Sequence, residues 1–243
     1  MRPPVLIIGA HRSGTSATTH ALQILGLQVG HRLDSHYEPK ALQGLHDVYL
    51  QKVGASWHNP GPFLESIRTA EGERRCVDYL RENVGNEFGK IFGYRKNPRG
   101  LWMLAQLKLG APWGWKEPRT TLFAAAWLKI FPEARVVHVL RDPIAAAKSI
   151  RHRELQFQAS GDAPNGKIDN LDYCLGLVRT YVEAGERLAG CENYFRVAFE
   201  DIQANASNAL DQTARFCRLQ FTPKQLAIAA ATIRPAGFKS TSI

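Results

Sequence analysis

The sequence predicts an α/β fold of three layers, in which helices cover both faces of a parallel β-sheet. Two observations support this prediction. The runs Val5–Ile8 and Arg135–Leu140 are rich in valine, isoleucine and leucine, which is typical of strands buried on both faces. Segments with apolar residues at helical spacing follow these runs. An alternation of strands and helices implies right-handed crossovers between parallel strands.

The two clearest units each consist of a strand, a loop and a helix. After the strand at Val5–Ile8, a helix is predicted over residues 15–25, where a glycine follows it. After the strand at Arg135–Leu140, Asp142 is placed to cap a helix over residues 143–153, whose first residue is a proline.

The remaining elements are assigned from shorter patterns. Further helices are predicted over residues 39–53, 119–131, 170–188 and 202–217 and after Pro223, and further strands over residues 113–116 and 194–199. The segments without a predicted element are a Gly/Pro/Trp loop at 57–63, a mixed polar region from there to Arg99, a mobile surface loop at 160–167 and a frayed C-terminus.

Length and composition agree with this class. The chain has 243 residues, of which 44% are hydrophobic and 22% are charged. A chain of this length can bury a large core without disulfides, and we expect a single domain over residues 1–243. The composition excludes disordered and fibrous proteins.

The chain is basic, with 31 Lys and Arg residues against 22 Asp and Glu residues and a net charge of +9. This excess suits an anionic partner such as a nucleotide, a nucleic acid, an anionic glycan or a membrane surface. The basic residues do not gather into arrays with interleaved aromatic residues, and no nucleic-acid-binding motif is visible. We therefore expect no nucleic-acid partner.

The four cysteines include no C-x-x-C pair, so the sequence predicts free thiols and no metal site. The first apolar run is too short for a signal peptide, and the longest apolar stretch, residues 122–131, falls far below the length of a membrane span. We expect a cytoplasmic protein without a transmembrane segment. The sequence leaves the oligomeric state open.

The first motif is a glycine-framed loop, Gly9-Ala-His-Arg-Ser-Gly-Thr-Ser, between the first strand and the first helix. Its spacing is that of a Walker A loop, in which backbone N–H groups and a helix N-terminus bind a phosphate. However, Thr15 stands where the Walker lysine follows the second glycine. Arg12 is instead the cation of the loop, and Ser13, Thr15 and Ser16 supply hydroxyl groups.

Two further motifs follow later strands. Arg141 stands where the strand Arg135–Leu140 ends, at the edge where open α/β sheets bind ligands. Ser149 lies about two helical turns beyond the cap of the following helix. An arginine and a hydroxyl group at one such corner can hold a second phosphate. The third motif places Lys116 and Arg119 around a proline, again after a short strand.

Together these residues resemble the sulfotransferases that use 3′-phosphoadenosine 5′-phosphosulfate (PAPS), in particular a bacterial branch with a His-Arg-Ser-Gly-Thr-Ser loop. The resemblance covers roughly residues 5–149 in motif order. It implies a P-loop-like fold and the transfer of a sulfuryl group from PAPS to a hydroxyl acceptor, a glycan or a small molecule. The product nucleotide would be adenosine 3′,5′-bisphosphate (PAP), and no metal would be required.

The family's functional residues carry over wherever this sequence matches its motifs. The resemblance assigns the 5′-phosphosulfate to Arg12, Ser13, Gly14, Thr15 and Ser16, and the 3′-phosphate to Arg141 and Ser149. It assigns the transferring group to Lys116, which Glu117 follows in place of the family's usual Asp, and we place Arg119 among the nucleotide-binding residues. Late in the chain, Phe199-Glu-Asp resembles a strand-end motif of the family, and Lys239 is the candidate for its C-terminal basic segment.

The resemblance also implies a general base at Glu38, ahead of a predicted helix and a Gly-Ala-Ser-Trp segment. This sequence departs from the family's pattern because Pro39 follows Glu38. Three nearby residues are alternatives for the same role: Asp34, His36 and His46. In this interpretation Glu38 takes the acceptor's proton, while Arg12 and Lys116 neutralise the bridging oxygen and the departing phosphate.

Two other function classes fit parts of the sequence. A P-loop kinase of small molecules would explain the first loop, but the missing Walker lysine and the lack of a clear Mg-binding Asp on a second strand disfavour it. A non-enzymatic polyanion-binding protein would explain the net charge alone. The acceptor's identity stays open, and residues 40–110 and 155–190 are expected to line its site.

Overall fold

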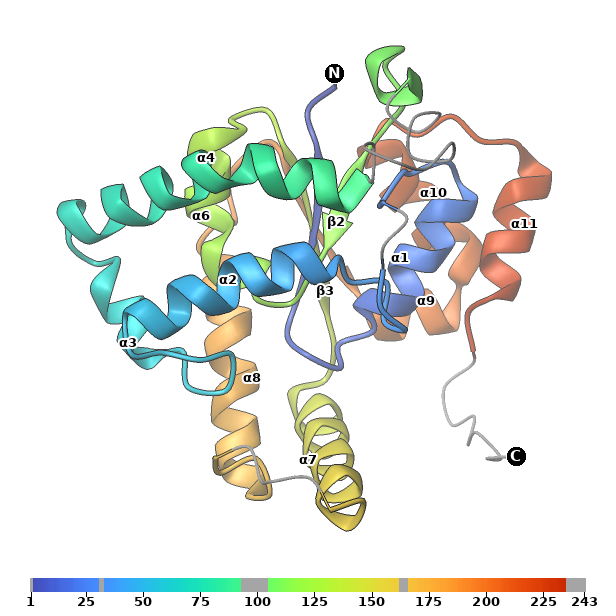
Figure 1. Cartoon of the computed structure of the whole chain (residues 1–243). Coiled ribbons are helices and arrows are strands. Elements are labelled where there is room, and N and C mark those ends of the chain that lie inside the picture. The colour runs from blue at the N-terminus through green and yellow to red at the C-terminus, as the bar shows by residue number, and fades with distance from the viewer. Residues whose placement is uncertain (1, 31–32, 93–104, 162–165, 235–243) are drawn as a thin grey trace.

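The computed structural model describes residues 2–30, 33–92, 105–161 and 166–234. Within these residues, four parallel strands form a sheet in the order β2-β1-β3-β4. The strands are β1 (Val5–Ile8), β2 (Gly114–Lys116), β3 (Arg135–Leu140) and β4 (Tyr194–Ala198). Helices lie on both sides of this sheet (Figure 1), which confirms the predicted three-layer α/β class.

The helices form two groups that cover opposite faces of the sheet. One face is covered by α1 (Thr15–Ile24), α9 (Phe199–Ala204), α10 (Ala206–Phe216) and α11 (Pro223–Ala231). The other face is covered by α2 (Lys40–Lys52), α3 (Gly61–Ser66), α4 (Ala70–Phe92), α6 (Thr120–Ile130), α7 (Pro143–Ala159) and α8 (Leu171–Glu186). None of the described helices is long and apolar enough to cross a membrane.

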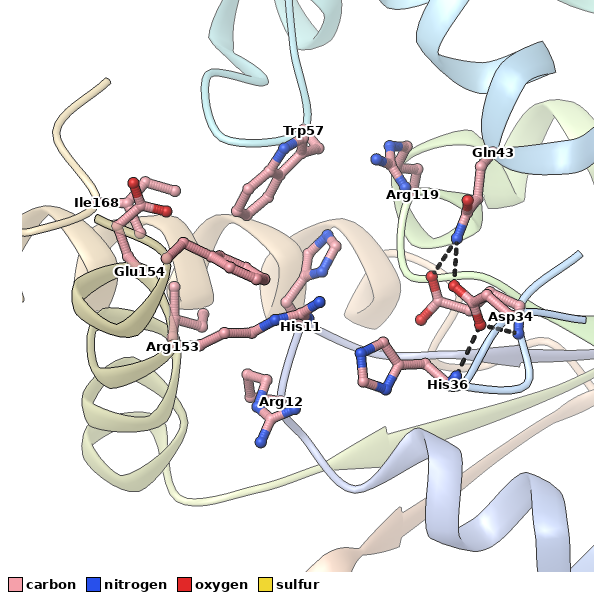
Figure 2. Close-up of a pocket in the computed structure, with 13 residues that line it drawn as sticks. His11, Arg12, Asp34, His36, Gln43, Trp57, Arg119, Arg153, Glu154 and Ile168 are labelled. Atoms are coloured by element: carbon pink, nitrogen blue, oxygen red, sulfur yellow. Dashed lines mark hydrogen bonds between the residues drawn. The ribbon is translucent and has the colours of Figure 1, made fainter. Parts of the chain in front are cut away.

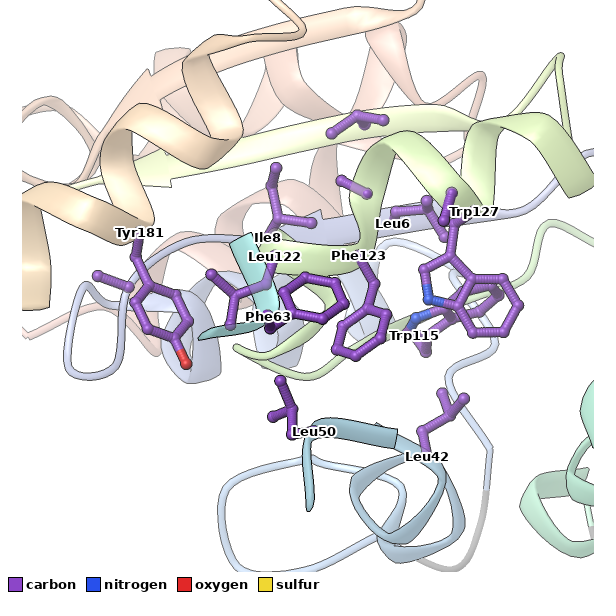
Figure 3. Close-up of a cluster of buried hydrophobic side chains, with 14 of the residues drawn as sticks. Leu6, Ile8, Leu42, Leu50, Phe63, Trp115, Leu122, Phe123, Trp127 and Tyr181 are labelled. Atoms are coloured by element: carbon purple, nitrogen blue, oxygen red, sulfur yellow. The ribbon is translucent and has the colours of Figure 1, made fainter. Parts of the chain in front are cut away.

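The side chains of β1 divide between the two cores. Leu6 and Ile8 are buried in the cluster that includes the aromatic residues of α6 (Figure 3), whereas Val5 and Ile7 are buried in the cluster beneath α1 and α10. Successive side chains of a strand point to opposite faces, so a strand between two helical layers must be apolar at every position. This explains the continuous apolar run at the start of the sequence.

The loop that follows β1 begins at the point where the strand order of the sheet reverses. The chain leaves β1 for β2 on one side and then crosses back to β3 on the other side of β1. In doubly wound sheets, ligands bind in the crevice at the carboxyl edge where the strand order reverses in this way. The loop after β1 and the corner after β3 both begin at this crevice.

The largest difference from the predicted elements is α4, which occupies part of the region expected to be merely polar. Its outer face carries exposed ion pairs, such as the one between Glu71 and Arg74 at 2.7 Å. Its inner face buries Cys76 and Leu80, one helical turn apart. The apolar stripe is too narrow to stand out from the charged residues around it.

Other differences concern element boundaries. The predicted helix over residues 202–217 is divided into α9 and α10, because Asn205 is not helical and its side chain accepts a hydrogen bond from the Asn208 N–H at 3.2 Å. The short helix α3 begins within the predicted loop at 57–63, and α7 extends to Ala159. Residues 162–165 of the predicted mobile loop, and Lys239 with the rest of the C-terminus, lie outside the described residues.

Candidate active site

The loop after β1 depends on two backbone conformations in the left-handed region. Gly14, which precedes α1, has φ 90°, and Arg12 has φ 67°, a conformation that costs energy for a residue with a side chain. The hydroxyl group of Ser13 donates to the carbonyl oxygen of Ala10 at 2.7 Å and so closes the loop. Gly14 provides no side-chain cap, and the first turn of α1 contains no acidic residue. The N–H groups of this turn are therefore suited to an anion.

The residue after β4 explains why position 14 must be a glycine. A Cβ atom on Gly14 would collide with the ring of Phe199, the first residue of α9. The guanidinium of Arg141 lies 5.9 Å from the centre of the same ring. Glu200 accepts a hydrogen bond from the Asp142 N–H at 3.0 Å. The segment 199–200 thus joins the loop after β1 to the corner after β3.

The first and second sequence motifs meet in the crevice. The Nε atom of Arg12 donates to the hydroxyl oxygen of Ser149 at 3.0 Å, and the guanidinium of Arg141 donates to the carbonyl oxygen of Arg12 at 2.9 Å. Within the described part of the chain, neither guanidinium forms an ion pair with a carboxylate. Burial and the charges of Arg153 and Arg141 lower the pKa of Arg12. The crevice is therefore short of negative charge.

The third motif reaches the same place from β2. The amine of Lys116 lies 2.7 Å from Oε1 of Glu38 and donates to the hydroxyl oxygen of Ser16 at 3.1 Å. Lys116 is fully buried and Glu38 is 8% exposed. Burial raises the pKa of Glu38 and lowers the pKa of Lys116, and the attraction between the two groups opposes both shifts. Glu38 is consequently a stronger proton acceptor than an exposed glutamate.

A turn anchored by Asp34 holds Glu38 in this position. One oxygen of Asp34 accepts hydrogen bonds from the N–H groups of His36 and Glu38, at 2.8 and 2.9 Å. The side chain of Gln43 donates to the other oxygen at 3.0 Å and to Oε2 of Glu38 at 2.8 Å. Burial alone would raise the pKa of Asp34, but these hydrogen bonds lower it. Asp34 is thus occupied as an anchor and is a weaker base than Glu38.

Glu117, next to Lys116, belongs to a buried network. One of its oxygens accepts a hydrogen bond from Nδ1 of His46 at 2.7 Å, and the other accepts one from Arg119 at 2.6 Å. The indole of Trp127 donates to Nε2 of His46 at 3.1 Å, which leaves Nδ1 as the donor to Glu117. Burial opposes ionisation of Glu117, yet His46 and Arg119 lower its pKa to about 2. The ring of His46 is fully buried, with both nitrogens bonded inside the protein.

Arg119 is held differently from the other predicted nucleotide-binding residues. Its guanidinium pairs with Asp47 as well as with Glu117, each at 2.6 Å. These two carboxylates outweigh burial and raise the pKa of Arg119. Its positive charge is therefore already neutralised, unlike the charges of Arg12 and Arg141.

Arg12 and Glu38 line a pocket of about 290 Å³, which Figure 2 shows in close-up. Its polar wall includes Asp34, His36 and Gln43, and its opposite wall includes Trp57, Phe157 and Ile168. Arg119 lies at its edge, whereas Lys116, Arg141 and Ser149 do not line it. The pocket thus adjoins the crevice and shares Arg12 and Glu38 with it.

His11 and Arg153 also line this pocket, although neither was assigned a role from the sequence. The ring of His11 lies 4.6 Å from the ring of Trp57 and 5.6 Å from that of Tyr181, between centroids. Burial and the charge of Arg119 lower the pKa of His11 to about 3, so this ring is neutral. Arg153 lies on α7, four residues after Ser149. This helical spacing places both residues on one face, and it was the signal in the sequence that could have found Arg153.

Comparisons with known proteins identify the family of this chain. A family model described as the sulfotransferase family matches residues 3–223. In a comparison with curated protein sequences, none matched this chain. Among the described residues, no cluster of three or more histidine, cysteine, aspartate or glutamate side chains could hold a metal ion.

Solved sulfotransferase structures have a similar fold. A sulfotransferase from Mycobacterium avium matches with a TM-score of 0.53 and 17% identity, over 95% of this chain and 67% of that one. A mouse sulfotransferase complexed with PAP matches with a TM-score of 0.54 and 10% identity, over 99% and 67%. A sulfotransferase from Alicyclobacillus acidocaldarius matches with a TM-score of 0.50 and 14% identity, over 96% and 94%. Because the family model matches nearly the whole sequence, this chain belongs to the sulfotransferase family.

Proposed function

We propose that this protein transfers a sulfuryl group from PAPS to a hydroxyl group of a glycan or small molecule and releases PAP. The observation that carries the proposal is the meeting of Arg12, Arg141 and Ser149 at the crevice, where neither guanidinium has a carboxylate partner among the described residues. The donor has phosphate groups at two positions of its ribose. Two cations at adjacent strand ends suit such a nucleotide.

The residues of the crevice divide between the two ends of this donor. The N–H groups of the first turn of α1, with Gly14, Thr15 and Ser16, bind the 5′-phosphosulfate, while Arg141 and Ser149 bind the 3′-phosphate. Ser13 contributes by closing the loop through its bond to Ala10. Arg119, with its charge already neutralised, contributes to the wall of the acceptor pocket. The sulfuryl group carries one negative charge, which the side-chain cations can neutralise, so the proposal includes no metal.

In the transfer itself, the oxygen of the acceptor forms a bond to sulfur while the bond from sulfur to the 5′-phosphate oxygen breaks. Glu38 takes the proton from the acceptor hydroxyl, and its raised pKa suits this task. Lys116 and Arg12 stabilise the charge that develops on the departing oxygen. Once Glu38 is protonated, it no longer neutralises Lys116, whose full charge then acts on the leaving group.

The three alternatives for the base differ in their hydrogen bonds and in their burial. Hydrogen bonds hold both oxygens of Asp34, and His46 is buried with both ring nitrogens bonded. His36 lines the pocket, and burial and the charge of Arg153 lower its pKa. His36 is therefore the alternative that competes with Glu38.

We infer that residues 1–243 form one domain, since the described helices all cover one sheet. We further propose that it acts in the cytoplasm, because the four cysteines are free, which suits a reducing compartment.

The proposal is tested by incubating the protein with radiolabelled PAPS and a panel of sugars, phenols and alcohols. We expect labelled product from the natural protein and a loss of ~100-fold or more in Arg12→Ala and Lys116→Ala. Arg68→Ala, which removes an exposed arginine paired with Glu65, is the control and should keep full activity. Equal product from Arg12→Ala and Lys116→Ala would contradict the proposal. Tighter binding of Mg-ATP than of PAP would favour a kinase instead.

A further inference from the structure

Arg153 is a cation of the pocket for which the proposed transfer has no use. Figure 2 shows its side chain extending from α7 toward His11, and the guanidinium lies 5.1 Å from the centre of the Phe157 ring. Within the described part of the chain, it forms no ion pair and no hydrogen bond. Its donors are therefore available to a ligand in the pocket.

The carboxylates around Arg153 are already engaged. Glu38 pairs with Lys116, and Asp34 accepts three hydrogen bonds. Glu154 accepts a hydrogen bond from Gln158 at 3.3 Å and has a further partner. After burial, the charge of Arg153 is the largest influence that lowers the pKa of both Arg12 and His36. The positive charge of Arg153 thus disfavours the charged forms of Arg12 and His36. An anion bound beside Arg153 relieves this repulsion.

The walls of the pocket indicate where such an anion comes from. The pocket contains Glu38, the proposed base, and shares Arg12 with the crevice, but Lys116, Arg141 and Ser149, which are assigned to the donor, do not line it. The aromatic side chains of Trp57 and Phe157 line it, and they suit the body of an organic molecule. An anion beside Arg153 therefore belongs to the acceptor and not to the donor.

We propose that the acceptor is a small hydroxyl compound that also carries an oxyanion group such as a carboxylate, and that Arg153 binds this group. The inference rests on the proposed function and adds the chemical class of the acceptor. The guanidinium offers paired donors that match the two oxygens of a carboxylate. The acceptor's hydroxyl group then lies at Glu38 and its body between Trp57 and Phe157. A volume of about 290 Å³ is suited to a small molecule and not to a protein side chain with its backbone.

The test measures binding to the PAP-loaded protein by calorimetry, with two acid and ester pairs as probes. The pairs are 4-hydroxyphenylacetate with its methyl ester, and glucuronate with its methyl ester. We expect the natural protein to bind each acid ~10-fold more tightly than its ester. Arg153→Gln should abolish this preference, and Arg153→Lys should retain part of it. Arg179→Gln removes an exposed arginine outside the pocket and should leave the preference unchanged.

Three results would overturn the inference. The first is equal binding, or no binding, of acid and ester to the natural protein. The second is an acid preference that persists in Arg153→Gln. The third is a fall in PAP affinity in Arg153→Gln, which would assign Arg153 to the nucleotide. A natural protein that does not bind PAP would contradict the proposed function, and this inference with it.

Discussion

Lys116 and Glu38 are 78 positions apart in the sequence, yet the amine of Lys116 lies 2.7 Å from Oε1 of Glu38. The amine also contacts the hydroxyl group of Ser16 in the first turn of α1. A single buried cation thus joins the proposed base to the phosphate loop. The two ends of the proposed reaction are coupled through this amine.

Replacing Glu38 should separate binding from turnover. In Glu38→Gln we expect turnover to fall by ~100-fold or more, because the amide cannot take the acceptor's proton. PAP should bind at least as tightly as before, because Lys116 loses the carboxylate that competes for its charge. Radiolabel transfer and PAP calorimetry measure the two effects, with the exposed Glu82→Gln as control. Unchanged turnover would transfer the role of base to His36.

The same pair predicts a narrow pH profile of kcat/KM. The base must be deprotonated, so activity falls as the pH decreases through the raised pKa of Glu38. Lys116 must be protonated, so activity also falls as the pH increases through its lowered pKa. Both limits should lie closer to neutrality than those of exposed glutamate and lysine side chains. An acidic limb that persists in the residual activity of Glu38→Gln would contradict this assignment.

Gly14→Ala should damage both the phosphate loop and the fold. Its φ of 90° is unfavourable for alanine, and the added methyl group would displace Phe199. We expect the free energy of unfolding to fall by ~2 kcal/mol and PAP affinity to fall with it. Urea unfolding and calorimetry measure these effects. Gly44→Ala within α2 is the matched control: its Cβ would meet no atom within 4 Å, and it should stabilise by ~0.5 kcal/mol. Equal stability of the two variants would argue against a strained Gly14.

Glu117→Gln should destabilise the protein in a pH-dependent way. Folding lowers the pKa of Glu117 from 4.5 to about 2, so its stabilising contribution is complete above pH 4.5 and is lost as the pH falls from 4.5 toward 2. At pH 7 we expect a loss of ~3 kcal/mol in the free energy of unfolding, because His46 and Arg119 lose a buried anionic partner.

This difference between Glu117→Gln and the natural protein should shrink when urea unfolding is repeated at pH 3. Glu82→Gln, which changes an exposed glutamate on α4, should show little difference at either pH. A difference for Glu117→Gln of the same size at both pH values would show that the ionised carboxylate is not what stabilises this network.

Local patterns in the sequence were enough to predict the strands of the sheet and the glycine-framed loop after β1. These features depend on local patterns: a strand such as β1, buried on both faces, must be apolar throughout, and the left-handed turn before α1 requires Gly14. The cap of α7 was equally local, since Asp142 accepts a hydrogen bond from the Ala145 N–H at 2.7 Å. Helix α4 was not predicted, because its many charged residues hide the helical spacing of its few apolar residues.

Which side chains meet depends instead on how distant segments of the chain pack together. No local pattern shows that Lys116 pairs with Glu38, that Arg119 is neutralised by Asp47, or that Arg153 faces the pocket without a partner among the described residues. These relationships arise because helices from distant parts of the chain pack on one sheet and bring charged groups out of water. The free energy of a buried charge depends on its partners, and those partners come from other segments of the chain.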